Sequence, residues 1–238
     1  SLAQTTWFRR LATNGTETAA SNELQISIQS PVGNPAVFGS NQWNVYAYHG
    51  TDLNLGAGNI YRGFYTNTDL NINTNNDWNN NLSPSSAANY QGCFVNVDNF
   101  TWVMKRQGFP LGNYIIDMPV MDNDFVIFVN GTQVYQHAGS CCGPYNGVIL
   151  GILNASSTVE IRVNDYGSPG EARVNFITDL QAGSIGSNQV FCNNTTVPNL
   201  FTSVIDAYGG LTGISYQWQD SIIGGTWQNI PGATNNTF

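Results

Sequence analysis

Residues 114–136 constrain the fold more than any other stretch, because two β-rich runs flank a short acidic segment and lead into a tight turn. The runs are residues 114–118 and 125–129, and Asn130–Gly131 behind them is the strongest short signal for a β-hairpin. Both alternating sets of residues in 125–129 are apolar, so at least one face of that strand must be covered by a second sheet. The sequence therefore predicts packed sheets, with the acidic segment 122–124 raised on a loop clear of their core.

Most of the remaining chain reads the same way. Clean alternation occurs at 24–28 and 43–48, and β-rich runs follow at 93–97, 100–105, 147–153, 158–163 and 172–177. No run of ten or more residues combines helical periodicity with helix-forming composition. A polar, asparagine-rich tract at 66–92 is predicted to be a long loop. We expect an all-β fold, a β-sandwich or jelly roll, with Trp102 in its core.

The charge balance excludes several classes of partner. The chain carries 15 acidic and 7 basic residues, for a formal net charge of -8. Such a protein cannot neutralise a run of phosphates, which argues against nucleic acid and against an anionic membrane surface. No apolar stretch approaches the length of a membrane span, so we expect no membrane insertion.

The N-terminus and the cysteines favour a secreted, extracellular protein. Residues 1–3 are typical of the small-residue end of a secretory signal peptide. The four cysteines lack zinc-site spacing and are better explained by disulfides. We expect the adjacent Cys141 and Cys142 to reach different partners, or one of them a partner and the other none, rather than each other. Cys93 is expected to pair with one of them. Cys192 is expected to pair with a residue beyond Phe238.

A domain boundary is predicted at Gly183, where residues 182–188 are small and flexible. The first domain would span 1–183. Residues 184–238 have the character of an immunoglobulin-like module, which needs about 100 residues and seven strands. We therefore expect this second module to be incomplete, with the natural chain continuing past Phe238.

Five segments, in order, resemble the protective-antigen-type β-sandwich module of bacterial toxins, yeast flocculins and carbohydrate-active proteins. They lie within residues 43–176 and are Asn76-Asp77-Trp78 with Ser83-Pro84, then 98–105, 112–116, 122–131, and finally 159–163 with 170–176. In lectin-like members of this family, two consecutive aspartates bind calcium, which in turn binds sugar hydroxyls. The resemblance thus implies a lectin-like sandwich.

The match at the acidic segment is imperfect. Asp122 corresponds to the first family aspartate, Asn123 replaces the second, and Asp124 stands where many relatives have glycine. The resemblance implies calcium ligands at Asp122 and Asp124, with all three residues at the ligand site. The alternative is a plain turn that uses Asp and Asn for local hydrogen bonds. Loop 139–145 is expected to cap the same end of the domain.

Trp78 also has two interpretations. On an asparagine-rich loop it could serve as an exposed platform for a sugar ring, and on that basis we include it among the candidate ligand-binding residues. The alternative is that it folds back onto its own domain, the role that the family resemblance favours.

The second part resembles the immunoglobulin-like repeats of giant Bacteroidetes surface proteins. The matching segments are 183–192, Tyr216-Gln217-Trp218 and 227–234. Those proteins are exported by the type nine secretion system and include gliding-motility adhesins. The triplet Asp220-Ser221-Ile222 is similar to the motif that these bacteria O-glycosylate, which implies modification at Ser221.

Catalysis finds little support. Neither His49 nor His137 lies in a recognisable nucleophile or metalloprotease motif, so we do not expect an enzyme, although sequence alone leaves paired glycosidase carboxylates open. The sequence and its resemblances together predict a secreted cell-surface adhesin. Its N-terminal tip, carried on a stalk of immunoglobulin-like repeats, would bind a surface polysaccharide, another glycan or another surface ligand, with calcium. The rivals are a structural or protein-docking tip module, which would contact secretion-system or cell-surface proteins, and an accessory domain of a polysaccharide-degrading enzyme.

Overall fold

The computed structural model describes residues 4–79, 81–139, 141–167, 170–186, 188–190, 199–210 and 214–238. These residues form strands and loops with two short helices, which confirms the predicted all-β class. In chain order the elements are β1 (Thr6–Phe8), β2 (Leu11–Asn14), β3 (Glu17–Ala20), β4 (Leu24–Ile26), β5 (Gly39–Ser40), β6 (Trp43–His49), β7 (Ile60–Asn67), β8 (Ile72–Asn73), α1 (Thr74–Trp78), the 3₁₀-helix η1 (Pro84–Ser86), β9 (Gln91–Gly92), β10 (Phe100–Gln107), β11 (Gly112–Asp122), β12 (Phe125–Val129), β13 (Thr132–His137), β14 (Tyr145–Leu153), β15 (Thr158–Asp165), β16 (Glu171–Asp179), β17 (Ser184–Ile185), β18 (Ser203–Ile205), β19 (Gln219–Asp220) and β20 (Gln228–Asn229).

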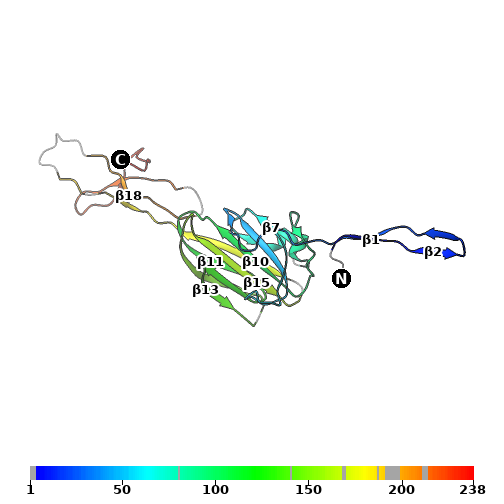
Figure 1. The fold of residues 1–238 in the computed structure, drawn as a ribbon. Coiled ribbons are helices and arrows are strands. Elements are labelled where there is room, and N and C mark those ends of the chain that lie inside the picture. Colours follow the sequence, from blue (N-terminus) through cyan, green and yellow to red (C-terminus); the bar gives the residue numbers. More distant parts are fainter. Residues whose placement is uncertain are drawn as a thin grey trace.

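Two layers of strands form the body of the molecule (Figure 1). One layer has the order β13-β12-β15-β10-β5, and β6 lies against β10 and leads into a smaller β6-β7-β9 sheet. The facing layer has the order β14-β11-β16-β8. Neighbouring long strands in both layers are antiparallel. This arrangement is the sandwich that the apolar strands require.

The core lies between the layers and is rich in aromatic residues. Its largest fully buried side chains include Trp43, Trp102, Phe100, Phe125 and Phe176. The predicted core position of Trp102 is confirmed, because none of its surface is exposed. Its indole packs against the ring of Phe100, with the two ring centroids 5.3 Å apart.

The predicted hairpin is present between β12 and β13. Asn130 and Gly131 both adopt positive φ, at 50° and 79°, as a tight hairpin turn demands. Phe125 and Ile127 are fully buried in the main core, and Val126 on the opposite face is also buried. Both faces of β12 are thus covered.

The acidic segment lies where the chain crosses between the layers. Strand β11 continues past its predicted end and pairs with β16 as far as Asp122, which stands opposite Glu171. Strand β12 begins three residues later, at Phe125, but belongs to the other sheet. The segment therefore does not rise on a loop clear of the core, as the sequence suggested, because a crossing between two packed sheets stays close to both.

The polar tract at 66–92 contains more structure than predicted. It contributes strand β8 to the edge of the second sheet and the short helix α1, which Asn73 caps by accepting the Asn75 amide. Trp78 ends this helix only 3% exposed, with its ring edge-on to Trp102 and Phe100. Trp78 is therefore a core residue and cannot serve as an exposed stacking platform. The packing alternative describes it correctly.

Two smaller parts extend from opposite ends of the body, as Figure 1 shows. At one end residues 6–26 form a long two-stranded arm in which β1 pairs with β4 and β2 with β3. At the other end residues 181–238 contain the short ladders β17-β18 and β19-β20. Among the described residues, no helix has the length and apolar character needed to cross a bilayer.

The C-terminal part contacts the body near the start of β11. The Gly209 amide donates to the Leu111 carbonyl at 3.2 Å. Gln181, shortly after β16, forms an isolated β-bridge with Tyr208. Its own apolar cluster is small, with the rings of Phe201, Trp218 and Phe238 stacked on one another. Because β11 runs from this contact to Asp122, the acidic segment lies at the far end of the sandwich, roughly 30 Å away.

Candidate cation and ligand site

Asp122 ends strand β11 with its carboxylate almost fully withdrawn from water. The residue is 5% exposed, and its Oδ1 atom is buried without a hydrogen-bond partner among the described residues. A buried carboxylate oxygen that accepts no hydrogen bond is strongly unfavourable unless something else satisfies it. A bound proton or cation would therefore stabilise the Asp122 carboxylate.

Asp165 provides a second buried carboxylate near Asp122. We call the region that contains these two residues the Asp122 corner. It ends strand β15 and is fully buried, and its Oδ2 atom also has no hydrogen-bond partner in the described part of the chain. Its Oδ1 atom accepts the Gly167 amide at 3.1 Å. The two carboxylates come from different sheets and approach each other because β12, which directly follows the crossing at Asp122, pairs with β15.

The charges at this corner repel one another. Burial raises the pKa of Asp122 above its usual range, and the negative charge of Glu171 raises it further. Burial likewise raises the pKa of Asp165 to about 7; the Gly167 amide opposes this shift, while the charges of Asp122 and Asp98 add to it. A group of carboxylates that disfavours its own ionisation is the electrostatic condition in which a bound cation is most stabilising.

Asn123 and Asp124 are occupied by local hydrogen bonds instead. The Asn123 amide donates to the Asn164 carbonyl at 2.7 Å, and its side-chain oxygen accepts the Tyr166 amide at 2.9 Å. Both oxygens of Asp124 are engaged, one accepting the Gly139 amide at 2.8 Å and the other the Tyr166 hydroxyl at 2.9 Å. For these two residues the turn interpretation fits, and Asp165 rather than Asp124 offers the second unpartnered carboxylate oxygen.

Sequence reasoning missed Asp165 for an identifiable reason. In the run Asn164-Asp165-Tyr166-Gly167 it looks like an ordinary strand-ending turn, and Asp165 is 43 residues from Asp122 in the chain. The one signal in the sequence was that Asp165 lies at the end of a predicted strand. That strand pairs with the strand that follows the acidic segment. Only the strand order brings the two aspartates together.

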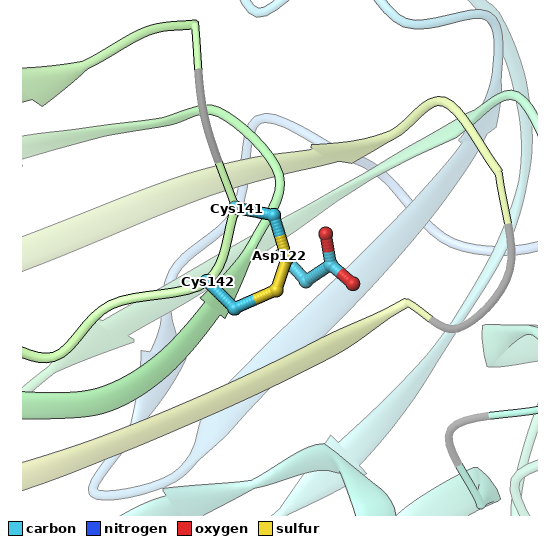
Figure 2. Close-up of side chains that lie close together, drawn as sticks. All are labelled: Asp122, Cys141 and Cys142. Carbon is cyan, nitrogen blue, oxygen red and sulfur yellow. A yellow bond between two sulfur atoms is a disulfide. The ribbon is translucent and has the colours of Figure 1, made fainter.

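The segment around Cys141 and Cys142, called the cysteine loop below, borders the corner, as expected. Its disulfide does not follow the prediction. The Met121 amide donates to the Cys142 carbonyl at 2.8 Å, which places the loop against the end of β11. Cys141 and Cys142 are bonded to each other, as Figure 2 shows. The expected pairing of Cys93 is wrong, because its thiol is free and donates to the Gln29 carbonyl at 3.2 Å. Cys192 lies outside the described residues.

Tyr166 is the exposed aromatic residue next to this corner. Its side chain is 53% exposed, while its hydroxyl is fixed by Asp124 and by the Asn164 side-chain amide at 3.1 Å. A ring anchored by its polar end presents an ordered apolar face to solvent. Tyr166 thus has the properties for which Trp78 was proposed.

The donor set fits a hard cation. Calcium takes six to eight oxygen ligands, often several carboxylates with carbonyls and bound hydroxyls. Asp122 and Asp165 would hold such an ion through their unpartnered oxygens, with Asp98 adding negative charge nearby. The disulfide sulfurs beside Asp122 carry no charge and are poor ligands for calcium.

The predicted modification site lies away from this corner. Ser221 is exposed in the C-terminal part, where its hydroxyl donates to the Ile222 carbonyl at 3.0 Å. His137 lies beside the corner, opposite Phe125 in the β12–β13 pair, and its ring packs against Phe125 and Tyr145.

Comparisons with known proteins give little direct guidance. Residues 181–238 match a family described as a domain of unknown function, DUF8696. No curated protein matches the chain in sequence. Among solved structures the chain is similar to the GH31 alpha-xylosidase of Xanthomonas citri, with 11% identity and a TM-score of 0.32, over 56% of this chain. That alignment spans only 13% of the xylosidase, and at this TM-score it carries no argument about function.

Proposed function

We propose that this protein is a secreted cell-surface adhesin whose N-terminal sandwich binds a surface polysaccharide or another glycan through a calcium ion. The observation that carries the proposal is the pair of buried, unpartnered carboxylate oxygens on Asp122 and Asp165. An ion held there would complete its oxygen shell with hydroxyls of a bound sugar.

The surroundings of the corner support a sugar as the guest. The exposed ring of Tyr166 offers an apolar face on which a pyranose ring can stack. The hydrogen bonds from Tyr166 to Asn123 and Asp124 fix this ring relative to the carboxylates before any ligand arrives. A pre-ordered site loses less entropy on binding.

The position of the corner supports a role at the tip of a longer molecule. It lies at the end of the sandwich opposite the C-terminal part, which contacts the body at Leu111. A stalk of immunoglobulin-like repeats would extend from the opposite end, so the corner would share its end of the body only with the arm of residues 6–26 (Figure 1). The further elements of the proposal, namely export by the type nine system, a link to gliding motility and glycosylation of Ser221, rest on the resemblances in the sequence.

A glycan array probed with the wild-type protein, in calcium and in chelator, tests the proposal. We expect binding in calcium that disappears with chelator. Asp165→Asn should lose it, because the neutral amide removes a charged ligand. Tyr166→Ala should lose glycan binding yet retain calcium binding by calorimetry, since its ring contacts the guest rather than the ion.

The matched control is Asp179→Asn, which removes an exposed carboxylate at the end of β16 that lies away from the Asp122 corner. It should leave array binding unchanged. If wild-type protein shows no glycan signal in either condition, the lectin function is refuted and a protein-docking tip module becomes the better explanation.

A further inference from the structure

A second set of potential metal ligands at this corner shares Asp122 with the proposed calcium site and adds two sulfur atoms that the calcium site does not use. One ligand atom from each of Asp122, Cys141 and Cys142 can be chosen so that all three lie within 4.8 Å of one another. Figure 2 shows the sulfur pair beside the Asp122 side chain. In the oxidised protein both sulfurs are used in their mutual bond.

The segment that carries the two cysteines is held by other contacts besides that bond. On one side the Met121 amide holds the Cys142 carbonyl at 2.8 Å, and on the other the Gly139 amide donates to Asp124 at 2.8 Å. Neither contact involves a sulfur atom. The two thiols of the reduced protein would therefore stay next to the Asp122 carboxylate.

Asp122 itself is ready to act as a ligand. It is 5% exposed, and its Oδ1 atom has no hydrogen-bond partner among the described residues, so binding a cation breaks no existing interaction. Zinc binds thiolate sulfur at about 2.3 Å and carboxylate oxygen at about 2.0 Å, so three ligands on one ion lie roughly 3.5 Å apart. The three ligand atoms already lie within 4.8 Å of one another, and reduction would let the two sulfurs move apart toward that spacing.

We propose that reduction of the Cys141–Cys142 disulfide converts this corner into a site for a thiophilic divalent cation of the zinc class, held by both thiolates and the Asp122 carboxylate. An external dithiol supplies two electrons and two hydrogens. The disulfide becomes two thiols while the reductant becomes a disulfide. The metal then displaces one proton from each thiol, and water occupies the remaining coordination position.

This inference goes beyond glycan binding and does not require it. In the oxidised protein the corner presents only oxygen ligands, which suit calcium. In the reduced protein it presents two thiolates and one carboxylate, which suit zinc. The redox state of one adjacent cysteine pair would thus select which class of ion the corner accepts.

Cobalt(II) is the probe, because thiolate ligation produces intense sulfur-to-metal charge-transfer absorption. The full-length protein is reduced with dithiothreitol, desalted without oxygen and titrated with Co²⁺, and a matched oxidised sample is treated identically. We expect the charge-transfer band only in the reduced sample, at one Co²⁺ per chain, with loss of the band on adding Zn²⁺.

Two variants separate this site from other thiols. Cys93→Ser/Cys192→Ser should keep the band, whereas Cys141→Ser/Cys142→Ser should lose it. Asp122→Asn should weaken Co²⁺ binding by about 10-fold or more, since even outer-shell partners of a metal site contribute about 10- to 100-fold. Metal-free melting curves show whether each variant folds.

The proposal is overturned if reduced wild-type protein shows no charge-transfer band, or if Cys141→Ser/Cys142→Ser retains it. It is also overturned if folded Asp122→Asn binds Co²⁺ as tightly as wild type. None of these readouts uses a glycan, so failure here and failure of the lectin function are distinguishable.

Discussion

Two corners of the sandwich withdraw an aspartate from water, Asp77 partly and Asp122 almost completely, and they treat it in opposite ways. Asp77, on helix α1, accepts hydrogen bonds from the Tyr65 hydroxyl at 2.9 Å and from the Asn67 amide at 3.0 Å. At the other corner, Asp122 and Asp165 each keep one buried oxygen that accepts none. Burial raises the pKa at both corners. The difference is that the protein satisfies Asp77 internally and leaves the other corner to be satisfied from outside.

A carboxylate that is withdrawn from water is therefore not itself a sign of a binding site. Asp77 belongs to the packing of the Trp78 helix, whose neighbours hold it in place. The Asp122 corner brings together two carboxylates with missing partners, a nearby charge and an exposed ring. An incomplete set of hydrogen bonds, rather than acidity, distinguishes the two.

The largest expected effect concerns the corner that contains Asp77 and Trp78. Trp78→Ala should lower the free energy of unfolding by about 3 to 5 kcal/mol, because it removes a buried aromatic ring from between Phe100 and Trp102. Urea denaturation measures it. Trp227→Ala, which truncates a ring that is 69% exposed, should change stability by less than about 0.5 kcal/mol. A loss below about 1 kcal/mol for Trp78→Ala would contradict its core assignment.

The next largest effect concerns the corner of Asp122 and Asp165, whose buried oxygens lack hydrogen-bond partners among the described residues. Calcium at 100 times its dissociation constant should stabilise the wild-type protein by about 2.7 kcal/mol, because the ion binds only the folded state. Asp122→Asn and Asp165→Asn should abolish this gain in thermal melts, whereas Asp77→Asn should keep it. A wild-type melting temperature that does not respond to calcium would refute the site.

Removing the satisfied carboxylate should have a smaller cost that calcium does not change. Asp77→Ala should destabilise the protein by about 2 kcal/mol, since it leaves the Tyr65 hydroxyl and the Asn67 amide without their acceptor. The measurement is urea denaturation with and without calcium. If calcium rescued this variant, the contrast between the two corners would fail.

The smallest effect is a pH dependence. Burial raises the pKa of Asp165 to about 7, so the fold favours its protonated form. The stability contributed by this group is fully present below the usual aspartate pKa and is lost as pH rises through about 7. Between pH 6 and pH 8 the calcium-free protein should therefore lose about 1.4 kcal/mol through this group. Asp165→Asn should flatten that part of the profile in chelator, and an equally steep profile in this variant would assign the effect elsewhere.

Much of the fold followed from local patterns. The apolar alternation of 125–129 and the Asn130–Gly131 turn predicted β12 and its hairpin, because these signals depend on neighbouring residues alone. The buried faces on both sides of β12 followed from the same run. Trp102 was placed in the core on its position within a β-rich run.

The parts that sequence reasoning missed depend on residues distant in the chain. Asp165 joins Asp122 only because strands of two sheets end at one corner. Asn67 engages Asp77, and Trp78 packs on Trp102, because the polar tract folds back over the core. Nothing in the adjacency of Cys141 and Cys142 indicated that they would pair with each other, since that depends on the course of the loop beside β11.

The antiparallel pairing of β11 and β16 has a mechanical consequence. The chain leaves the body for the C-terminal part at the end of β16, next to Asp179, while the proposed ligand is held at the opposite end, beside Glu171. Tension between a captured ligand and the anchored end would act along these strands, perpendicular to the hydrogen bonds between them. Those bonds would be sheared together rather than peeled apart one by one, so the domain would resist extension along the direction in which an adhesin is pulled.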